Sequence, residues 1–335
     1  RLELRAGDRH LARHGPAEAG CGGASGDERD TCRFISIKTM SARLEAEGIV
    51  ASATARRDYR ELLLTPTDLA ESVSGIILCD ETFGQELADG RPFPVAAREL
   101  DILPGIKVDT GTTPLPGAGG ALITEGLDGL GTRLASYAER GGAFAKWRAV
   151  FDVRTITPYT ARANAHALAR YAALCQDNGI VPIVEPEVLC NGDHDLAASE
   201  QATRLALGML FDELTGAAVD LAGIVLKPNF VTPGLDAVQA PATEVAAATL
   251  DVLRDTVPAA VPGIAFLSGG HPTERVCEFL HELNAIPDLP WQVTFSFGRA
   301  LVSAALHTWA GSAANVEAAQ RVLVANCTQA AAATR

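Results

Sequence analysis

The sequence has 335 residues, enough to bury a large core in one α/β domain or in two domains of ordinary size. It carries 41 acidic against 28 basic residues, a formal net charge of −13, which excludes a general nucleic-acid or anionic-membrane surface because both need basic patches. No apolar run approaches the roughly 18 to 20 residues that a membrane helix needs, so we expect no nucleic-acid and no membrane partner. Any anionic ligand must then be bound by locally placed cations.

The N-terminal segment, residues 1–31, lacks sustained hydrophobic periodicity and is rich in Arg, Gly, Ala and Asp. Such a composition is typical of a segment that does not fold with the rest. We therefore expect residues 1–31 to be unstructured or foreign to the fold, and residues 32–335 to form a single domain. Within that domain, Cys32–Ile37 ("CRFISI") is a poorly formed candidate for a first strand, and two amphipathic helical segments follow it.

Seven short apolar runs then recur along the chain, and segments with helical periodicity separate most of them. Some of those segments end in Gly, as helices often do. Alternating strands and helices predict a parallel sheet with right-handed crossovers. The runs are "GIILCD" near residue 75, "GIKVD" near 105, "FAKWRAVF" near 144, "VPIVEPE" near 181, "AGIVLKP" near 222, "GIAFLSGG" near 263 and "WQVTFSFG" near 291.

Seven strands could form an open doubly wound sheet, whereas an eighth would close a (β/α)8 barrel. Cys32–Ile37 is the one candidate for that eighth strand. We favour the (β/α)8 TIM barrel with an atypical first strand, because polar residues gather at the C-terminal ends of the predicted strands, where barrel active sites lie. These polar residues are Lys107 and Asp109, Lys146 and Arg148, Glu185 and Glu187, Lys227, Ser268-Gly269-Gly270, and Gly298-Arg299.

Lys227 ends an unbroken apolar run in "AGIVLKPNFVTPG" and is one of only four lysines, the other basic residues being arginine. A buried ammonium is costly unless it is paired or loses its proton. An amine, unlike a guanidinium, can lose its proton and attack a carbonyl, which makes Lys227 a candidate Schiff-base nucleophile. The alternative is a lysine at the edge of the core whose side chain reaches solvent.

Glu185 and Glu187 lie two residues apart on one predicted strand and therefore point the same way. Paired carboxylates beside an amine suit proton transfer, because a neighbouring charge separates their two pKa values. Alternatively they are ion-pair partners of the nearby lysines. Both interpretations can hold together.

Two segments could bind phosphate. Ser268–Gly270, in "LSGGHPTE", offers backbone N–H groups and a hydroxyl, although Gly pairs after strands are often only tight turns. Gly298 and Arg299 after the last strand favour a phosphate site, because the loops after strands seven and eight often bind phosphate in barrels. Lys107 and Arg148 would form a second cationic pocket. A ligand with phosphate at both ends and a carbonyl between them fits this arrangement.

The seven cysteines are scattered and contain no CxxC pair, which indicates a reducing compartment and buried thiols. The histidines lie in helical or loop contexts without the spacing of metal ligands. We therefore expect no metal and no cofactor.

Six motifs, in order along about residues 38–327, resemble those of class I fructose-1,6-bisphosphate aldolase, the Schiff-base type. The resemblance implies a barrel that cleaves fructose 1,6-bisphosphate reversibly into dihydroxyacetone phosphate and glyceraldehyde 3-phosphate, in glycolysis and gluconeogenesis. It also implies a homotetramer in the cytoplasm or in a plastid. The motifs are "GIKVDTGTTPLPG", "AKWRAV", "PIVEPEVLCNGDHDL", "VLKPNFVTPG", "FLSGGHPTE" and "PWQVTFSFGRAL".

The resemblance further implies a role for each site residue. Lys227 would form the iminium with the ketose carbonyl, with Glu185 as general acid and base and Lys146 stabilising charge at the cleavage centre. Glu187 would hold these groups in position. The implied substrate-binding residues are Lys107 and Arg148 for one phosphate, Ser268, Gly269, Gly270, Gly298 and Arg299 for the other, and Arg43 and Thr39, the latter in place of the family's serine.

The chain departs from the family at its first strand. The family has an aspartate there that assists deprotonation of the C4 hydroxyl, whereas this chain has Phe34-Ile35-Ser36. Everything before about Lys38 is unlike the family, which suggests a mistranslated or rearranged 5′ end of the gene; a genuine loss is the alternative. A second hypothesis is therefore a sugar-phosphate-binding or structural paralogue with impaired turnover, because Phe34 stands in place of the aspartate. A third is a Schiff-base aldolase for another sugar phosphate.

Overall fold

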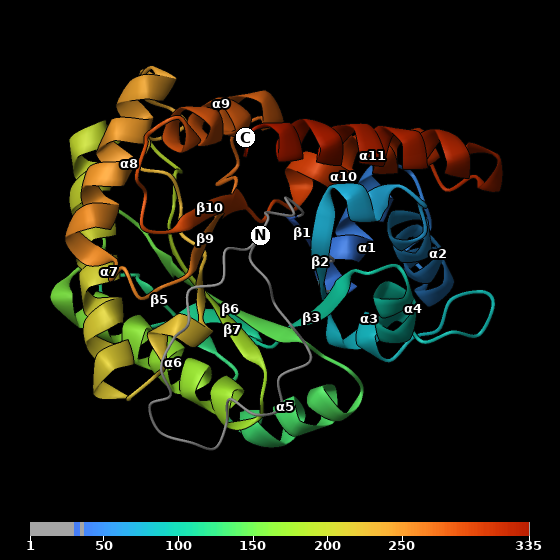
Figure 1. Cartoon of the computed structure of the whole chain (residues 1–335), viewed down its shortest axis with the longest axis horizontal. Coiled ribbons are helices and arrows are strands. Elements are labelled where there is room, and N and C mark those ends of the chain that lie inside the picture. Colours follow the sequence, from blue (N-terminus) through green and yellow to red (C-terminus); the bar gives the residue numbers. More distant parts are fainter. Residues whose placement is uncertain (1–29, 34–36, 335) are drawn as a thin grey trace.

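Strands and helices alternate along the chain in the computed structural model, which describes residues 30–33 and 37–334. Eight strands form one sheet in which all paired neighbours are parallel. The last strand lies against the first, so the sheet curls round on itself in the middle of the molecule (Figure 1). The predicted (β/α)8 barrel is confirmed. In sheet order, the strands are β1 (Asp30–Arg33), β2 (Val73–Leu78), β3 (Leu103–Lys107), β6 (Phe144–Phe151), β7 (Val181–Val188), β8 (Val225–Leu226), β9 (Gly263–Phe266) and β10 (Gln292–Phe295).

The first strand lies earlier in the chain than the sequence predicts. β1 pairs with β2 from Asp30 to Arg33, and α1 already begins at Ile37, so Cys32–Ile37 is not one strand. Pairing with β2, and not the apolar pattern of the segment itself, sets the strand's ends. Asp30 and Thr31 of β1 lie before the domain boundary expected after residue 31, and that boundary stays a prediction. Residues 1–29 and Phe34-Ile35-Ser36, where the family's aspartate is missing, lie outside the described residues.

Eleven α-helices in the described part of the chain surround the strands (Figure 1). The helix that follows β10 packs against the C-terminal helix, which also contacts α2. The helices are α1 (Ile37–Ala46), α2 (Ala53–Leu64), α3 (Asp80–Phe83), α4 (Phe93–Glu99), α5 (Leu130–Glu139), α6 (Pro158–Asp177), α7 (Leu196–Gly216), α8 (Ala242–Thr256), α9 (Thr273–Asn284), α10 (Arg299–Trp309) and α11 (Val316–Ala332), with short 3-10 turns at Leu69–Glu71, Leu221–Gly223 and Ala313–Asn315.

The two longest helices begin at residues that cap them. Thr157 and Thr160 form a reciprocal capping box at the start of α6, whose first residue is Pro158. The carboxylate of Asp195 accepts a hydrogen bond of 2.8 Å from the N–H of Ala198 at the start of α7. Such caps satisfy backbone donors that the helix itself leaves unpaired, and so fix where these helices start behind β6 and β7.

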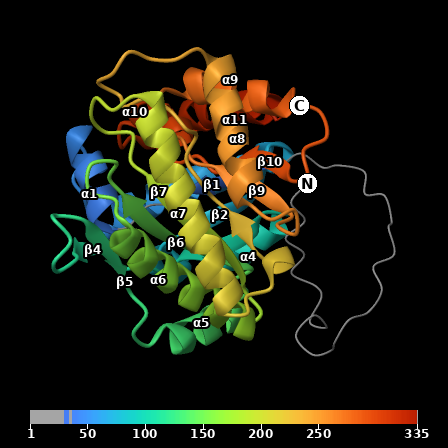
Figure 2. The same ribbon diagram turned by 90° about the vertical axis from the view of Figure 1, so that its left-hand side faces the viewer.

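An antiparallel hairpin of β4 (Gly111–Pro114) and β5 (Leu122–Glu125) follows β3 and stands at the edge of the molecule in Figure 2. This hairpin was not predicted, because its mostly exposed residues lack the alternation of a half-buried strand. The hydroxyl of Thr124 donates to the carbonyl of Arg148 at 2.8 Å. The hairpin is thereby fastened to the end of β6.

An apolar layer fills the barrel interior. It includes the ring of Phe144, which lies over Gly105 of β3: a Cβ on Gly105 would come within 2.1 Å of that ring. Only glycine at this position leaves space for the ring. The buried side chains of the layer come from five strands, and the main ones are Ile77, Phe144, Ile183, Val225 and Ala265.

Candidate active site

Charged side chains form a second layer inside the barrel, next to the apolar one. On four neighbouring strands they lie two positions further along the chain and on the same, inward-facing side. Alternate residues of a strand share a face, so the sequence places this charged layer directly next to the apolar one, toward the C-terminal end of the barrel. Register pairing sets two of these residues side by side across β3 and β6. The four residues are Lys107 of β3, Lys146 of β6, Glu185 of β7, and Lys227 immediately after β8.

Glu185 joins two of these lysines. Its Oε2 lies 2.8 Å from Nζ of Lys146, and its Oε1 lies 3.2 Å from Nζ of Lys227. All three side chains are fully buried, with 0% exposure. The alternative in which Lys227 reaches solvent is therefore wrong. A buried charge is tolerated when it is paired, and the shared carboxylate supplies that pairing to both amines.

Asp109 links the remaining lysine to this group. Nζ of Lys107 donates to the carbonyl of Asp109 at 2.6 Å and also contacts its carboxylate, whose other oxygen lies 3.5 Å from Nζ of Lys146. The same oxygen accepts a hydrogen bond of 3.3 Å from the backbone N–H of Arg148. Burial alone would raise the pKa of the Asp109 carboxyl, but Lys146 and Lys107 outweigh it and hold the pKa below its ordinary value.

From its sequence position Asp109 was expected at a strand end, without a role of its own. The feature of the sequence that could have indicated a role for Asp109 is the spacing in "GIKVD", which puts its carboxylate two residues after Lys107. What could not be read from the sequence is that the chain turns there, so that the carboxylate reaches both lysines.

Glu187 forms an ion pair with Nε of Arg148. Burial lowers the pKa of the Arg148 guanidinium, but the charge and hydrogen bond of Glu187 raise it more, and the net pKa lies above its ordinary value. Arg148 therefore stays charged, with its side chain 35% exposed. Glu187 thus contacts the arginine that was predicted to bind phosphate, and not the buried lysines.

The loop after β9 is a tight turn. The N–H of His271 donates to the carbonyl of Ser268 at 3.0 Å, and the two residues between them, Gly269 and Gly270, have φ values of 58° and 100°. Positive φ at both central positions is the pattern of a type I′ turn and favours glycine. Among the described residues, neither glycine N–H donates a hydrogen bond. Both donors are thus available to an anion.

Arg299 lies beside this turn. A Cβ on Gly270 would be 3.7 Å from Nη2 of Arg299, whose side chain is exposed and makes no ion pair within the described residues. Arg299 is the first residue of α10, and Gly298 precedes that helix as its N-cap. A helix N-terminus favours an anion. The structure therefore brings together Ser268, Gly269, Gly270, Gly298 and Arg299, as predicted for a phosphate site.

Ser296 is a residue of this region that the sequence analysis missed. Its hydroxyl is buried and has no hydrogen-bond partner among the described residues. The side chain follows β10, two residues before Gly298, in the motif "TFSFG". Its position at the end of a strand could have indicated a functional role. A single serine between two phenylalanines, however, is typical of a residue in the hydrophobic core.

Thr39 and Arg43 are the two predicted substrate contacts that lie on a helix. They are four residues apart on α1 and so share one face of it. Thr39 is exposed and Arg43 is half-buried. Their contact with substrate stays a prediction.

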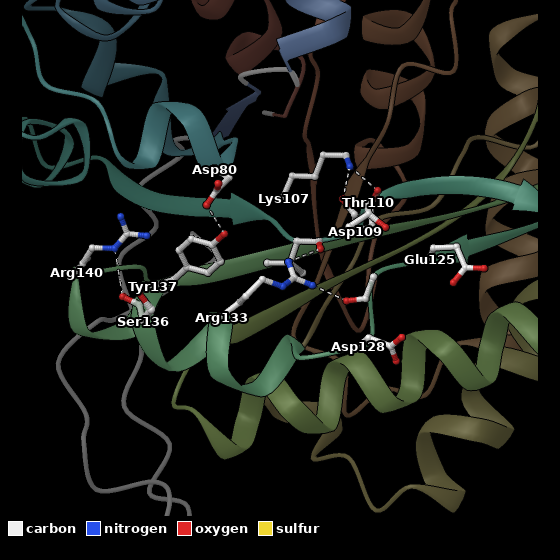
Figure 3. A pocket seen from close by; sticks show the side chains of 12 residues that line it. Asp80, Lys107, Asp109, Thr110, Glu125, Asp128, Arg133, Ser136, Tyr137 and Arg140 are labelled. Carbon is white, nitrogen blue, oxygen red and sulfur yellow. Dashed lines mark hydrogen bonds and ion pairs between the residues drawn. The ribbon is translucent and has the colours of Figure 1, made fainter.

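A cavity of about 610 Å³ opens beside Lys107 and Asp109 (Figure 3). Asp80, after β2, accepts a hydrogen bond of 2.7 Å from the hydroxyl of Tyr137, and Arg133 of α5 borders the same space. The side chain of Lys107 is 21% exposed here. Solvent therefore reaches the charged layer at Lys107, whereas the side chains of Lys146 and Lys227 have no contact with solvent. No sequence pattern marked the α5 residues.

Within residues 30–33 and 37–334, no group of three or more His, Cys, Asp and Glu side chains is arranged to hold a metal ion. Over the same ranges, every helix is too short or too polar to span a bilayer.

Comparison with known proteins identifies the family. Residues 34–335 match the family model described as fructose-bisphosphate aldolase class-I, glycolytic. The chain belongs to the class-I fructose-bisphosphate aldolase family, which is a family of lyases. The resemblance seen in the motifs is thereby confirmed.

Individual class-I aldolases match most of the chain. A probable fructose-bisphosphate aldolase class 1 of Xylella fastidiosa is 48% identical over 277 residues, which are 82% of this chain and 83% of that protein. The cytosolic fructose-bisphosphate aldolase 6 of Arabidopsis thaliana is 43% identical over 295 residues, 87% of this chain and 82% of that protein. The solved structure of Plasmodium falciparum fructose-bisphosphate aldolase, in a ternary complex with TRAP and a small-molecule inhibitor, superposes with a TM-score of 0.90 at 36% identity, covering 92% of this chain and 91% of that one.

Proposed function

We propose that this class-I aldolase cleaves fructose 1,6-bisphosphate reversibly into dihydroxyacetone phosphate and glyceraldehyde 3-phosphate through a Schiff base on Lys227. The observation that carries the proposal is the buried contact of Glu185 with Lys146 and Lys227. Iminium formation needs an unprotonated amine and an acid that helps the carbonyl oxygen leave as water. The amine and the acid are here in direct contact.

The burial of Lys227 supports a neutral amine. Its side chain is 0% exposed, and removing an ammonium from water is costly, so burial favours the unprotonated form. Nζ of Lys227 lies 3.2 Å from Oε1 of Glu185, which can accept the proton that the amine gives up. Lys146 lies 2.8 Å from the other oxygen of the same carboxylate and 3.5 Å from Asp109. Two carboxylates thus contact Lys146, which favours its charged form.

The chemistry follows from these positions. Nζ of Lys227 adds to C2 of the ketose, and Glu185 passes a proton to the C2 oxygen, which leaves as water to give the iminium. A base then removes the proton of the C4 hydroxyl, the C3–C4 bond breaks, and glyceraldehyde 3-phosphate departs while the electron pair remains on C3 as an enamine. Protonation of C3 and hydrolysis of the iminium release dihydroxyacetone phosphate and restore the amine. The ammonium of Lys146 stabilises negative charge beside the reacting carbons.

The two cationic regions support a substrate with a phosphate at each end. On one side are Arg299 and the N–H groups of Gly269 and Gly270, which donate to no other described residue. On the other are Arg148, which stays charged through Glu187, and the partly exposed Lys107. Lys227 follows β8, which lies between β6 and β9 in the order of the sheet. A bisphosphorylated ketose would thus present its carbonyl to Lys227.

A coupled cleavage assay with fructose 1,6-bisphosphate, together with borohydride trapping of dihydroxyacetone phosphate, tests the proposal. Trapping should add one ketose phosphate per chain, and peptide mass spectrometry should locate it on Lys227. The variant Lys227→Met should lose both trapping and cleavage. The matched variant Lys107→Met removes a lysine of the same layer and should still be trapped on Lys227. A label on another lysine would refute the assignment.

The second candidate is a sugar-phosphate-binding paralogue with impaired turnover. The observation that favours it is the sequence Phe34-Ile35-Ser36 where the family carries its first-strand aspartate. Such a protein would retain the Lys227 amine and its partner Glu185, so it would be trapped by borohydride but would not cleave the bisphosphate. Restoring aspartate at this segment should then raise cleavage by orders of magnitude.

The assembly and location are proposals that rest on the family. The molar mass of a homotetramer, measured by sedimentation, would be four times the chain mass of 35.0 kDa. A cytoplasmic location is supported by the cytosolic relative from Arabidopsis thaliana, and a plastid is the alternative. Analytical ultracentrifugation and imaging of the tagged chain test these two statements.

A further inference from the structure

Cys190 contacts the turn that carries the predicted phosphate donors. This residue follows β7 by two positions, and its Sγ–H donates a hydrogen bond to the carbonyl oxygen of Gly269. The sulfur would lie 3.6 Å from a Cβ on Gly269 and 3.8 Å from one on Gly270. The thiol therefore packs directly against both glycines of the turn.

The position of Cys190 is itself fixed by its backbone neighbours. The N–H of Leu189 donates to the carbonyl of Phe151 at 2.8 Å, and the carbonyl of Cys190 accepts from the N–H of Leu235 at 2.7 Å. The residue as a whole is 8% exposed. Cys190 thus gives the turn a contact that is anchored to the ends of β6 and β7.

The peptide between Gly269 and Gly270 needs such an anchor. The turn's own hydrogen bond joins Ser268 to His271 and leaves this central peptide unrestrained. Rotation of a central peptide interconverts the type I′ and type II′ turns, and two glycines oppose that rotation least. A hydrogen bond to the Gly269 carbonyl stops the rotation. Because a peptide unit is planar and trans, it also directs the N–H of Gly270 away from Cys190.

We propose that Cys190 is a positioning residue for substrate phosphate, whose thiol holds the Gly269–Gly270 peptide with its N–H turned toward the anion site. This inference rests on the proposed function, in which that turn and Arg299 bind one phosphate of the ketose. Cys190 does not touch the substrate. It acts by fixing the orientation of the Gly270 N–H, which could otherwise rotate away from the anion site.

The electrostatic surroundings of Cys190 agree with a role as a neutral donor. Burial raises the pKa of its thiol, the charge of Glu187 raises it further, and Arg299 and Arg148 oppose that shift only in part. The thiol therefore keeps its proton at neutral pH and can donate it in a hydrogen bond.

The variants Cys190→Ala and Cys190→Ser test the proposal in the full-length protein. Removing the donor in Cys190→Ala should raise KM for fructose 1,6-bisphosphate by roughly 5-fold, the worth of one hydrogen bond, while kcat changes little. Cys190→Ser keeps a donor at this position and should recover most of the loss. The inhibition constant of inorganic phosphate, measured as a competitive inhibitor, should rise in Cys190→Ala by the same factor as KM for the substrate.

The control is Cys175→Ala, which removes a fully buried thiol from α6, away from the turn. It should leave KM unchanged and alter only thermal stability. An unchanged KM in Cys190→Ala overturns the inference, and so do equal losses in the Ala and Ser variants, which would show a packing role. If the wild type cleaves the bisphosphate and is trapped on Lys227, either result leaves the proposed function standing. If the wild type neither binds nor cleaves the bisphosphate, both the function and the inference are refuted.

Discussion

Glu185 lies 3.2 Å from Nζ of Lys227 through one carboxylate oxygen, and both side chains are completely buried. The other oxygen is taken by Lys146 at 2.8 Å. The carboxylate is therefore held in a fixed position between two amines, without solvent contact. A proton that leaves Lys227 can pass directly to this carboxylate, which in the proposed mechanism later delivers a proton to the substrate.

Replacing this carboxylate by an amide should abolish proton transfer while keeping the shape of the site. We expect Glu185→Gln to lower kcat for cleavage by about 10²- to 10⁴-fold, the usual worth of a general acid or base, and to slow borohydride trapping. KM should change much less. The measurement is steady-state kinetics with the coupled assay.

The matched control for Glu185 is Glu187→Gln, on the same face of β7. Glu187 pairs with Arg148 and not with an amine, so its loss should act on substrate binding and raise KM more than it lowers kcat. Equal effects of the two variants on kcat would contradict the separate roles of the two carboxylates.

Asp109 should contribute to stability in a pH-dependent way. The folded protein holds the pKa of Asp109 below its ordinary value of about 3.9, so the unfolded chain takes up the proton first as pH falls. The stabilisation is complete above about pH 4 and is lost as pH drops through the folded-state pKa. We expect Asp109→Asn to cost about 3 kcal/mol or more at neutral pH, because it leaves Lys107 and Lys146 without this charge.

Denaturant unfolding of wild type and Asp109→Asn from pH 7 down to pH 3 tests this expectation. The difference between the two unfolding free energies should shrink toward the acid end of this range. A constant difference at all pH values would show that packing, and not charge, accounts for the loss.

The apolar layer below the charged one should be intolerant of a single methyl group. A Cβ at Gly105 would lie 2.1 Å from the ring of Phe144, so Gly105→Ala should destabilise the protein by about 1 to 3 kcal/mol or more. Gly208 of α7 offers the control: nothing lies within 4 Å of a Cβ placed there, and Gly208→Ala should stabilise by about 0.5 to 1 kcal/mol. Thermal denaturation of both variants, followed by circular dichroism, should give shifts of opposite sign.

The sequence was sufficient to predict which strand residues share the barrel interior. Lys107, Lys146 and Glu185 all sit at the C-terminal half of apolar runs, and the strict period of two fixes their common face once the strands are known to be parallel. That is why the charged layer could be predicted without any knowledge of loops.

Contacts that depend on the path of a loop could not be predicted in this way. Asp109 reaches two lysines because the chain turns into the β4–β5 hairpin, and that hairpin has no periodic pattern. Cys190 contacts Gly269 across a separation of 79 residues, and a lone thiol in a loop carries no signal of its partner. The limits of β1 were misplaced for a related reason, since pairing with β2 decided them.

His271, at the end of the predicted phosphate-binding turn, should make the stability of the protein sensitive to mild acid. Its imidazole lies 3.2 Å from the hydroxyl of Thr232, and its ring meets that of Phe279 edge-on at 5.7 Å between centroids. Burial lowers the pKa of His271, and the positive charge of Arg275 lowers it further. The unfolded chain, with an ordinary pKa of about 6.5, therefore binds the proton first as pH falls.

The unfolding free energy should thus be highest above about pH 6.5, and should decline below that value until the folded-state pKa of His271 is reached. This window lies well above the one expected for Asp109, so the two effects are separable. Replacing His271 by Gln removes the titrating group and should flatten the decline between pH 7 and pH 5 in denaturant titrations. If the unfolding free energy of His271→Gln declines as steeply as that of the wild type between pH 7 and pH 5, the acid sensitivity arises elsewhere in the protein.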